Sequence, residues 1–283
     1  MAEGAHVVIR ALVLTGHGIN CERETALAFK RAGAQATIAH LADWEAGLVD
    51  LGAHHLLALP GGFSFGDHLG SGRALAARLR QGALWEALRH FVDRGGYVLG
   101  ICNGFQALVK LGLLPALDGS RVPQASLVAN ASGRFEDRWV TLLPDPESPC
   151  TFTAGLGPLE LPVRHGEGRL VAAPDVLLRL AAEGLVALRY GDASGAPTEA
   201  YPANPNGSPG GIAGLCDPSG RVFGLMPHPE AYLDFTLHPA WTRRREMLVR
   251  AGQPVPVEGA GLALFRNVVA HARASLSQPA TLG

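Results

Sequence analysis

One cysteine of this chain lies where an enzyme would place a nucleophile. An apolar run at 97–101 leads into the sequence GICNG at 100–104, and a helical pattern follows. Flanking glycines permit a tight strand-to-helix turn that strains its central residue and exposes that side chain at the sheet edge. The thiolate is the reactive form of cysteine, and a helix N-terminus favours it. Most isolated cysteines are small buried hydrophobes, but this setting favours Cys102 as a nucleophile.

A histidine and a carboxylate follow a later apolar run. The sequence MPHPE occupies 226–230, and the two prolines limit the backbone freedom of His228. Glu230 can accept a hydrogen bond from one ring nitrogen while the other nitrogen faces the thiol, as in a catalytic triad. A surface histidine in a turn is the alternative. A metal site of His165, His228 and Glu230 is disfavoured because HxxxH and HExxH spacings are absent, so neither a metal nor a cofactor is predicted on this chain.

A glycine-rich loop is a candidate oxyanion site. The sequence PGGFSFGD at 60–67 follows an apolar run. Its backbone N–H groups, including that of Gly62, can approach a substrate closely and stabilise a tetrahedral oxyanion together with the amide of Asn103. A phosphate-binding loop is a poorer interpretation, because the lysine and hydroxyl of the GxxxxGK[ST] pattern are missing. A simple turn is the remaining alternative.

The elements that must position these residues follow from the apolar pattern. Alternating strand and helix signals predict parallel βαβ units, whose ligands bind at the carboxyl ends of the strands. Beyond residue 115 the strand signals are shorter and indicate mixed or antiparallel pairing. The predicted strands are 7–14, 35–41, 54–59, 97–101, 139–143, 161–163, 185–190, 212–215 and 222–225. The predicted helices are 21–32, 73–79, 84–94, 104–114 and 262–274.

Composition limits the class of protein. The 283 residues are 47% hydrophobic and 17% charged, with a net charge of -1, which argues against binding to nucleic acid or anionic membranes. The four cysteines are scattered, as in a cytosolic protein with reduced thiols. No apolar run approaches the roughly 20 residues of a membrane span, and we expect a cytoplasmic location. The expected organisation is a single domain over 1–283 with an inserted excursion at about 232–259.

These motifs, with several distant segments, resemble one enzyme family. The cysteine turn, the glycine-rich loop and the His-Pro-Glu sequence, in this order, resemble class I (triad-type) glutamine amidotransferases. Together with the other segments, they resemble the glutaminase subunits of phosphoribosylformylglycinamidine synthase. The segments are NCERET at 20–25, GGFSFGD at 61–67, GICNGFQ at 100–106, NASGRF at 130–135, HGEGR at 165–169, NPNGS at 204–208 and HPE at 228–230.

The resemblance implies a flavodoxin-like α/β fold, with a mostly parallel central sheet flanked by helices and a smaller mixed or antiparallel portion. It implies hydrolysis of glutamine through a cysteinyl thioester, with ammonia passed to an ATP-dependent synthetase subunit that also holds the ATP and Mg²⁺. A small accessory subunit is a further candidate partner. The implied roles are nucleophile for Cys102, acid/base for His228, orienter for Glu230, oxyanion amides for Gly62 and Asn103, and substrate binding for Gln106.

The same motifs are compatible with other functions. A γ-glutamyl hydrolase or cysteine peptidase can share the same nucleophile turn, and a scaffold subunit can lack activity altogether. The chain also departs from the family pattern at Ala231 and at 70–73, which bears on partner docking rather than on chemistry. The basic stretch 242–246 is interpreted as a solvated face or, less readily, as a docking surface.

Overall fold

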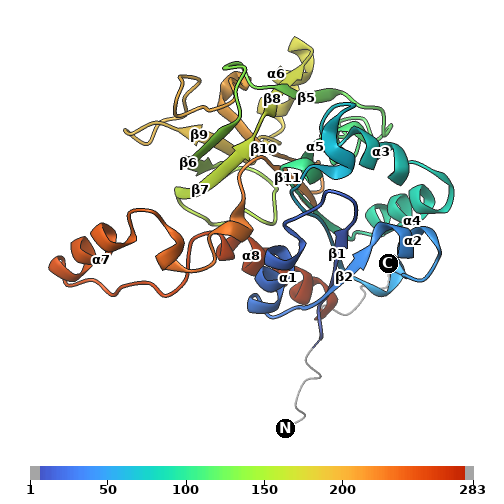
Figure 1. Cartoon of the computed structure of the whole chain (residues 1–283), viewed down its shortest axis with the longest axis horizontal. Helices are drawn as coiled ribbons and strands as arrows, with labels where there is room; N and C mark the ends of the chain where they lie inside the picture. The colour runs from blue at the N-terminus through green and yellow to red at the C-terminus, as the bar shows by residue number, and fades with distance from the viewer. Residues whose placement is uncertain (1–6, 278–283) are drawn as a thin grey trace, which may run out of the picture.

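The centre of the molecule is a nine-stranded sheet within residues 7–277, the part of the chain that the computed structural model describes (Figure 1). The strand order is β2-β1-β3-β4-β11-β10-β9-β6-β7. Its first five strands are parallel and have the flavodoxin-like order. These are β1 (Arg10–Thr15), β2 (Gln35–His40), β3 (Leu56–Leu59), β4 (Tyr97–Ile101) and β11 (Val222–Leu225).

Antiparallel strands continue the same sheet beyond its parallel half. They are β10 (Ile212–Cys216), β9 (Leu188–Gly191), β6 (Glu136–Pro144) and β7 (Leu159–His165). A second, two-stranded sheet pairs β5 (Ala125–Ala129) with β8 (Glu167–Ala172). The predicted α/β class, with a mostly parallel core and a smaller mixed or antiparallel portion, is confirmed, although β5 and β8 were not among the predicted strands.

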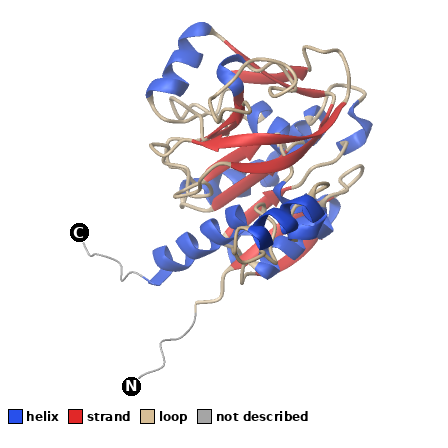
Figure 2. Ribbon diagram, turned by 90° about the vertical axis from the view of Figure 1, so that its left-hand side faces the viewer, coloured by secondary structure: helices blue, strands red, loops and turns tan. Residues whose placement is uncertain are grey.

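Helices lie around the strands (Figure 2). Helix α1 packs on α8 through Phe29 and Phe265, whose ring centroids are 5.0 Å apart, while α5 contacts α3 and β4. The helices are α1 (Glu22–Arg31), α2 (Leu41–Glu45), α3 (Arg73–Leu79), α4 (Gly82–Asp93), α5 (Asn103–Lys110), α6 (Pro174–Ala182), α7 (Trp241–Arg250) and α8 (Leu262–Ser277). No described helix is long and apolar enough to cross a membrane.

The central strands are buried along their whole length. Every residue of β3, β4 and β11 is buried, as expected for parallel strands with both faces covered, and this is why they appear as continuous apolar runs in the sequence. The helix predicted at 104–114 is shorter than expected and ends at Lys110. The residues after it are buried without being helical, so their apolar character extended the prediction.

Residues 232–259 contain more regular structure than their sequence pattern indicates. Helix α7 forms within this segment, and Figure 1 shows the segment as an arm at one side of the molecule. No residue of α7 is buried, so the helix lacks the apolar stripe that makes a helix visible in a sequence. The carboxylate of Glu160 in β7 anchors the arm, because it pairs with both His238 and Arg244.

Candidate active site

Cys102 occupies a strained turn between β4 and α5. Its φ of 50° and ψ of -103° lie in a region that non-glycine residues rarely adopt. The turn requires a glycine at 104, because a Cβ there would lie 1.8 Å from the carbonyl oxygen of Leu59. Cys102 is only 5% exposed, in contrast to the exposed side chain that its sequence motif predicts. Strand β7 provides the cover, since Sγ contacts the carbonyl oxygen of Arg164 at 3.6 Å.

The pairing of β4 with β11 brings His228 to the same sheet edge. Gly100 pairs with Gly224 and Ile101 with Leu225 in parallel register, so the two strands end side by side. The chain beyond β11 then turns, and the amide of His228 donates to the carbonyl oxygen of Pro162 at 2.8 Å. Two neighbouring strands therefore deliver the thiol and the imidazole to one place.

His228 and Glu230 form a buried hydrogen-bonded pair. Nδ1 of His228 lies 2.6 Å from Oε1 of Glu230, and Nε2 has no hydrogen-bond partner among residues 7–277. Burial by itself would lower the pKa of His228. The Glu230 carboxylate and interactions with the thiols of Cys102 and Cys21 outweigh it and raise this pKa well above its usual value. A cationic imidazole beside a thiol favours the reactive thiolate.

The glycine-rich loop and the start of α5 each supply one unengaged amide at the site. Gly62 has a φ of 151°, and a Cβ there would lie 2.5 Å from the carbonyl oxygen of Gly18. A backbone bridge between Ile19 and Gly62 holds the loop against the segment that follows β1. Within the described chain the amide N–H groups of Gly62 and Asn103 have no backbone acceptor. Their role as an oxyanion hole stays a prediction that this arrangement permits.

The side chains of Asn103 and Gln106 are both engaged in protein contacts. Asn103 accepts from the amide of Ser64 at 3.2 Å and donates to Asp67 at 3.3 Å, which ties the loop to α5. It also donates to Oε1 of Gln106 at 3.0 Å, and Nε2 of Gln106 donates to the carbonyl oxygen of Glu167. These contacts make Gln106 a positioning residue in this structure, and its direct contact with a substrate remains a prediction.

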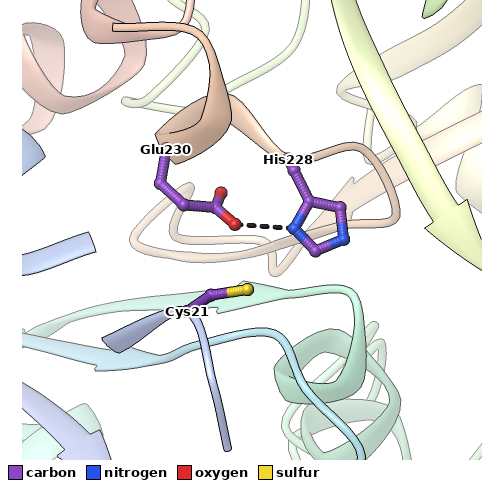
Figure 3. A group of neighbouring side chains, drawn as sticks. All are labelled: Cys21, His228 and Glu230. Atoms are coloured by element: carbon purple, nitrogen blue, oxygen red, sulfur yellow. Dashed lines mark hydrogen bonds and ion pairs between the residues drawn. The ribbon is translucent and has the colours of Figure 1, made fainter. Parts of the chain in front are cut away.

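Cys21 lies beside the site, although its sequence context did not predict a chemical role for it. One ligand atom each from Cys21, His228 and Glu230 lie within 4.8 Å of one another (Figure 3). His165 is not part of this group, and its Nδ1 instead contacts Oδ1 of Asn130 at 3.0 Å. Cys21 follows β1, so its place at the carboxyl edge of a parallel strand was the available signal.

The distant segments converge on the turn between β7 and β8. Asn130 donates to the carbonyl oxygen of His165 at 2.8 Å and accepts from the amide of Gly168 at 3.0 Å. Ser208 accepts from the amide of Leu170 at 3.0 Å. This turn also carries the carbonyl of Glu167 that Gln106 contacts. The segments at 130–135 and 204–208 therefore build one wall of the site.

The α/β fold, with a strained cysteine and a buried His-Glu pair at one strand edge, is typical of triad-type glutamine amidotransferases. In agreement, residues 8–272 match the family model of the CobB/CobQ-like glutamine amidotransferase domain. The chain is 42% identical over 267 residues to "Phosphoribosylformylglycinamidine synthase subunit PurQ" of Dehalococcoides mccartyi, covering 94% of this chain and 98% of the relative. The PurQ subunit of Methanococcus maripaludis strain C7 is 41% identical over 271 residues, with coverages of 94% and 98%.

A solved structure has the same architecture. A chain in the structure of PurLQS from Thermotoga maritima superposes with a TM-score of 0.67 at 28% identity, covering 94% of this chain and 99% of that one. The chain described here belongs to the PurQ family of glutamine amidotransferases.

Proposed function

We propose that this chain is the glutaminase subunit of phosphoribosylformylglycinamidine synthase, an enzyme of purine biosynthesis. It hydrolyses glutamine to glutamate and ammonia and supplies the ammonia to a synthetase subunit. The observation that carries the proposal is the interaction of the Cys102 thiol with His228, whose ring is hydrogen-bonded to Glu230, in a chain that aligns with PurQ subunits over nearly their whole length.

The chemistry follows from the positions of the side chains. The Cys102 thiolate attacks the side-chain carboxamide carbon of glutamine, and the amides of Gly62 and Asn103 stabilise the oxyanion that forms. The His228 imidazolium protonates the leaving nitrogen, so that ammonia departs and a γ-glutamyl thioester remains. Neutral His228 then takes a proton from water, the hydroxide attacks the thioester, and glutamate and the thiolate are released. Glu230 keeps the ring oriented through Nδ1.

The ammonia reacts on a partner polypeptide. The proposed partner is an ATP-dependent synthetase that converts formylglycinamide ribonucleotide to formylglycinamidine ribonucleotide. ATP and Mg²⁺ are proposed to act on that subunit, and a small accessory subunit is a further proposed member of the complex. The exposed side chains of Arg243 and Arg245 on the 232–259 arm are available for contact with such partners. We propose that the complex operates in the cytoplasm.

Product analysis tests this function. The chain is incubated with glutamine and, separately, with a γ-glutamyl peptide, each with and without the synthetase. The expected result is release of glutamate from glutamine, weak for the isolated chain and stimulated by the complete complex with its acceptor and ATP. Turnover of the peptide but not of glutamine, even in the complex, would overturn the proposal in favour of a γ-glutamyl hydrolase or peptidase. Absence of any turnover in the active complex would indicate a scaffold.

A further inference from the structure

Cys21 lies against the triad without a part in the proposed reaction. It is the residue before α1, and its side chain does not cap that helix. Its thiol donates only to Oδ1 of Asn20, at 3.3 Å, among the hydrogen bonds of residues 7–277. The imidazole of His228 and the carboxylate of Glu230 lie close to this thiol (Figure 3). A soft sulfur, an imidazole nitrogen and a carboxylate oxygen therefore converge where only two of them are needed for catalysis.

These three groups face a common space. A Cβ placed on Gly61 would lie 2.7 Å from Cε1 and 3.3 Å from Nδ1 of His228 and 3.4 Å from Sγ of Cys21, so a larger residue at 61 would intrude on both groups. Their ligand atoms lie within 4.8 Å of one another. A tetrahedral Zn²⁺ site separates a sulfur and a nitrogen ligand by about 3.5 Å, given bonds of about 2.3 and 2.1 Å. The Cys21 side chain does not cap α1, so its rotation can bring Sγ to this shorter distance from Nδ1 of His228.

The donor set and its access suit a thiophilic cation. Thiolate, imidazole and carboxylate are the usual zinc ligands, and the two anions balance the charge of the ion. The second carboxylate oxygen of Glu230 is buried without a hydrogen-bond partner among the described residues. A cavity of about 440 Å³ reaches Cys21 and Glu230 from outside. Arg164 adds a positive charge to the lining of this cavity, and Glu24 and Asp234 add negative charges.

We propose that Cys21, His228 and Glu230 form an inhibitory site for a thiophilic divalent cation of the Zn²⁺ type. Binding releases the protons of the Cys21 thiol and of Nδ1, and it takes Glu230 away from the ring. The remaining imidazole proton then resides on Nε2, the nitrogen that the reaction needs as a base. The ring cannot accept a proton from Cys102 or from water while the cation occupies Nδ1. Occupancy therefore stops glutamine hydrolysis reversibly.

Metal binding is measured on the full chain, independently of activity. Zn²⁺ affinity is determined by competition with a chromophoric chelator, and Co²⁺ replaces Zn²⁺ to report thiolate ligation through its charge-transfer absorption. The wild-type chain and Cys102→Ala should each bind one equivalent and show the thiolate band. Cys21→Ser should bind about tenfold or more weakly and lose the band. Serine is a favoured residue before a helix, so this variant is expected to fold, and Cys21→Ala provides a second test.

Specific results would overturn the site. Unchanged affinity for Zn²⁺ in both Cys21 variants would show that Cys21 is not a ligand. Loss of Zn²⁺ binding in Cys102→Ala would show that Cys102 supplies the thiolate in its place. Absence of Zn²⁺ binding to the wild-type chain would exclude the proposed metal site. The inhibitory effect rests on the proposed function and is measured in the complex, with each variant normalised to its own metal-free rate. Zn²⁺ should inhibit glutamine-dependent synthesis, and Cys21→Ser should raise the inhibitory concentration about tenfold or more. Metal binding as expected in a chain without glutaminase activity would refute the proposed function alone.

Discussion

The amide N–H of Cys102 donates a 2.8 Å hydrogen bond to the carbonyl oxygen of Leu225. This bond extends the ladder between β4 and β11 by one residue beyond β4. It holds the cysteine at a fixed position relative to the strand that leads to His228. The relative position of thiol and imidazole is therefore set by backbone pairing in the buried centre of the sheet, where it is least free to vary.

Replacement of Cys102 by alanine should abolish synthesis from glutamine in the complex but leave synthesis from added ammonium intact. Without the thiol no thioester can form, and glutamine-dependent synthesis should fall by roughly three orders of magnitude or more. Synthesis from added ammonium salt should stay near the wild-type rate, because that reaction occurs on the partner. Both rates are measured by product formation in the reconstituted complex. Loss of both activities would instead indicate that Cys102 is needed for assembly or folding.

The sequence predicts the site best where the signal is local. Glycines around Cys102, prolines around His228 and continuous apolar strands each constrain a few neighbouring residues, and the structure brings these elements to one sheet edge as expected. The burial of Cys102 under Arg164 and the approach of Cys21 to His228 depend on pairings between distant segments. Such contacts leave no periodic pattern in the sequence.

The missed elements have a similar explanation. Helix α7 has no fully buried residue, so no continuous apolar stripe marks it in the sequence. Strands β5 and β8 form a small sheet of their own and are only partly buried, which weakens the apolar run that identifies a strand. The engagement of Gln106 with Glu167 also follows from a remote turn that no local motif announces.

Replacement of Glu230 by glutamine should move the alkaline limb of the glutaminase pH profile to lower pH. The carboxylate raises the pKa of His228, so its removal lets the imidazolium lose its proton earlier. The value of kcat/KM should also fall by about 100-fold or more, because the ring loses its orienting partner. The raised pKa further implies that the pair stabilises the fold below about pH 6.5, the usual pKa of histidine, and that this stabilisation is lost as pH rises through the folded-state pKa.

The matched control for this experiment is Glu160→Gln. It removes a carboxylate that also contacts a histidine, at 3.0 Å from His238, but lies outside the group of Cys102, His228 and Glu230. Its pH profile for kcat/KM should keep the wild-type limb. An unshifted limb in Glu230→Gln, or an equal shift in both variants, would contradict the assigned part of Glu230.

The variant Gly62→Ala should lose most glutaminase activity. Its Cβ would lie 2.5 Å from the carbonyl oxygen of Gly18, so the loop must shift and carry the amide of residue 62 away from the oxyanion. Loss of one such donor reduces kcat by about 100-fold or more. Gly70→Ala is the control, because Gly70 also has a positive φ but no atom within 4 Å of a Cβ. Its kcat should stay within a few-fold of wild type, and similar losses in both variants would point to general destabilisation.

His165 should make the stability of the chain depend on pH below neutrality. Burial, and then the charge of His228, lower the pKa of His165 to about 4. Between this value and the usual pKa near 6.5 the unfolded chain binds the proton and the folded chain does not, so stability falls as pH falls through this window. Between pH 7 and pH 5 this one residue should cost about 2 kcal/mol of unfolding free energy. Urea unfolding at both pH values, compared with His165→Gln, isolates the effect. An equal pH dependence in the two proteins would show that His165 is not buried in its neutral form.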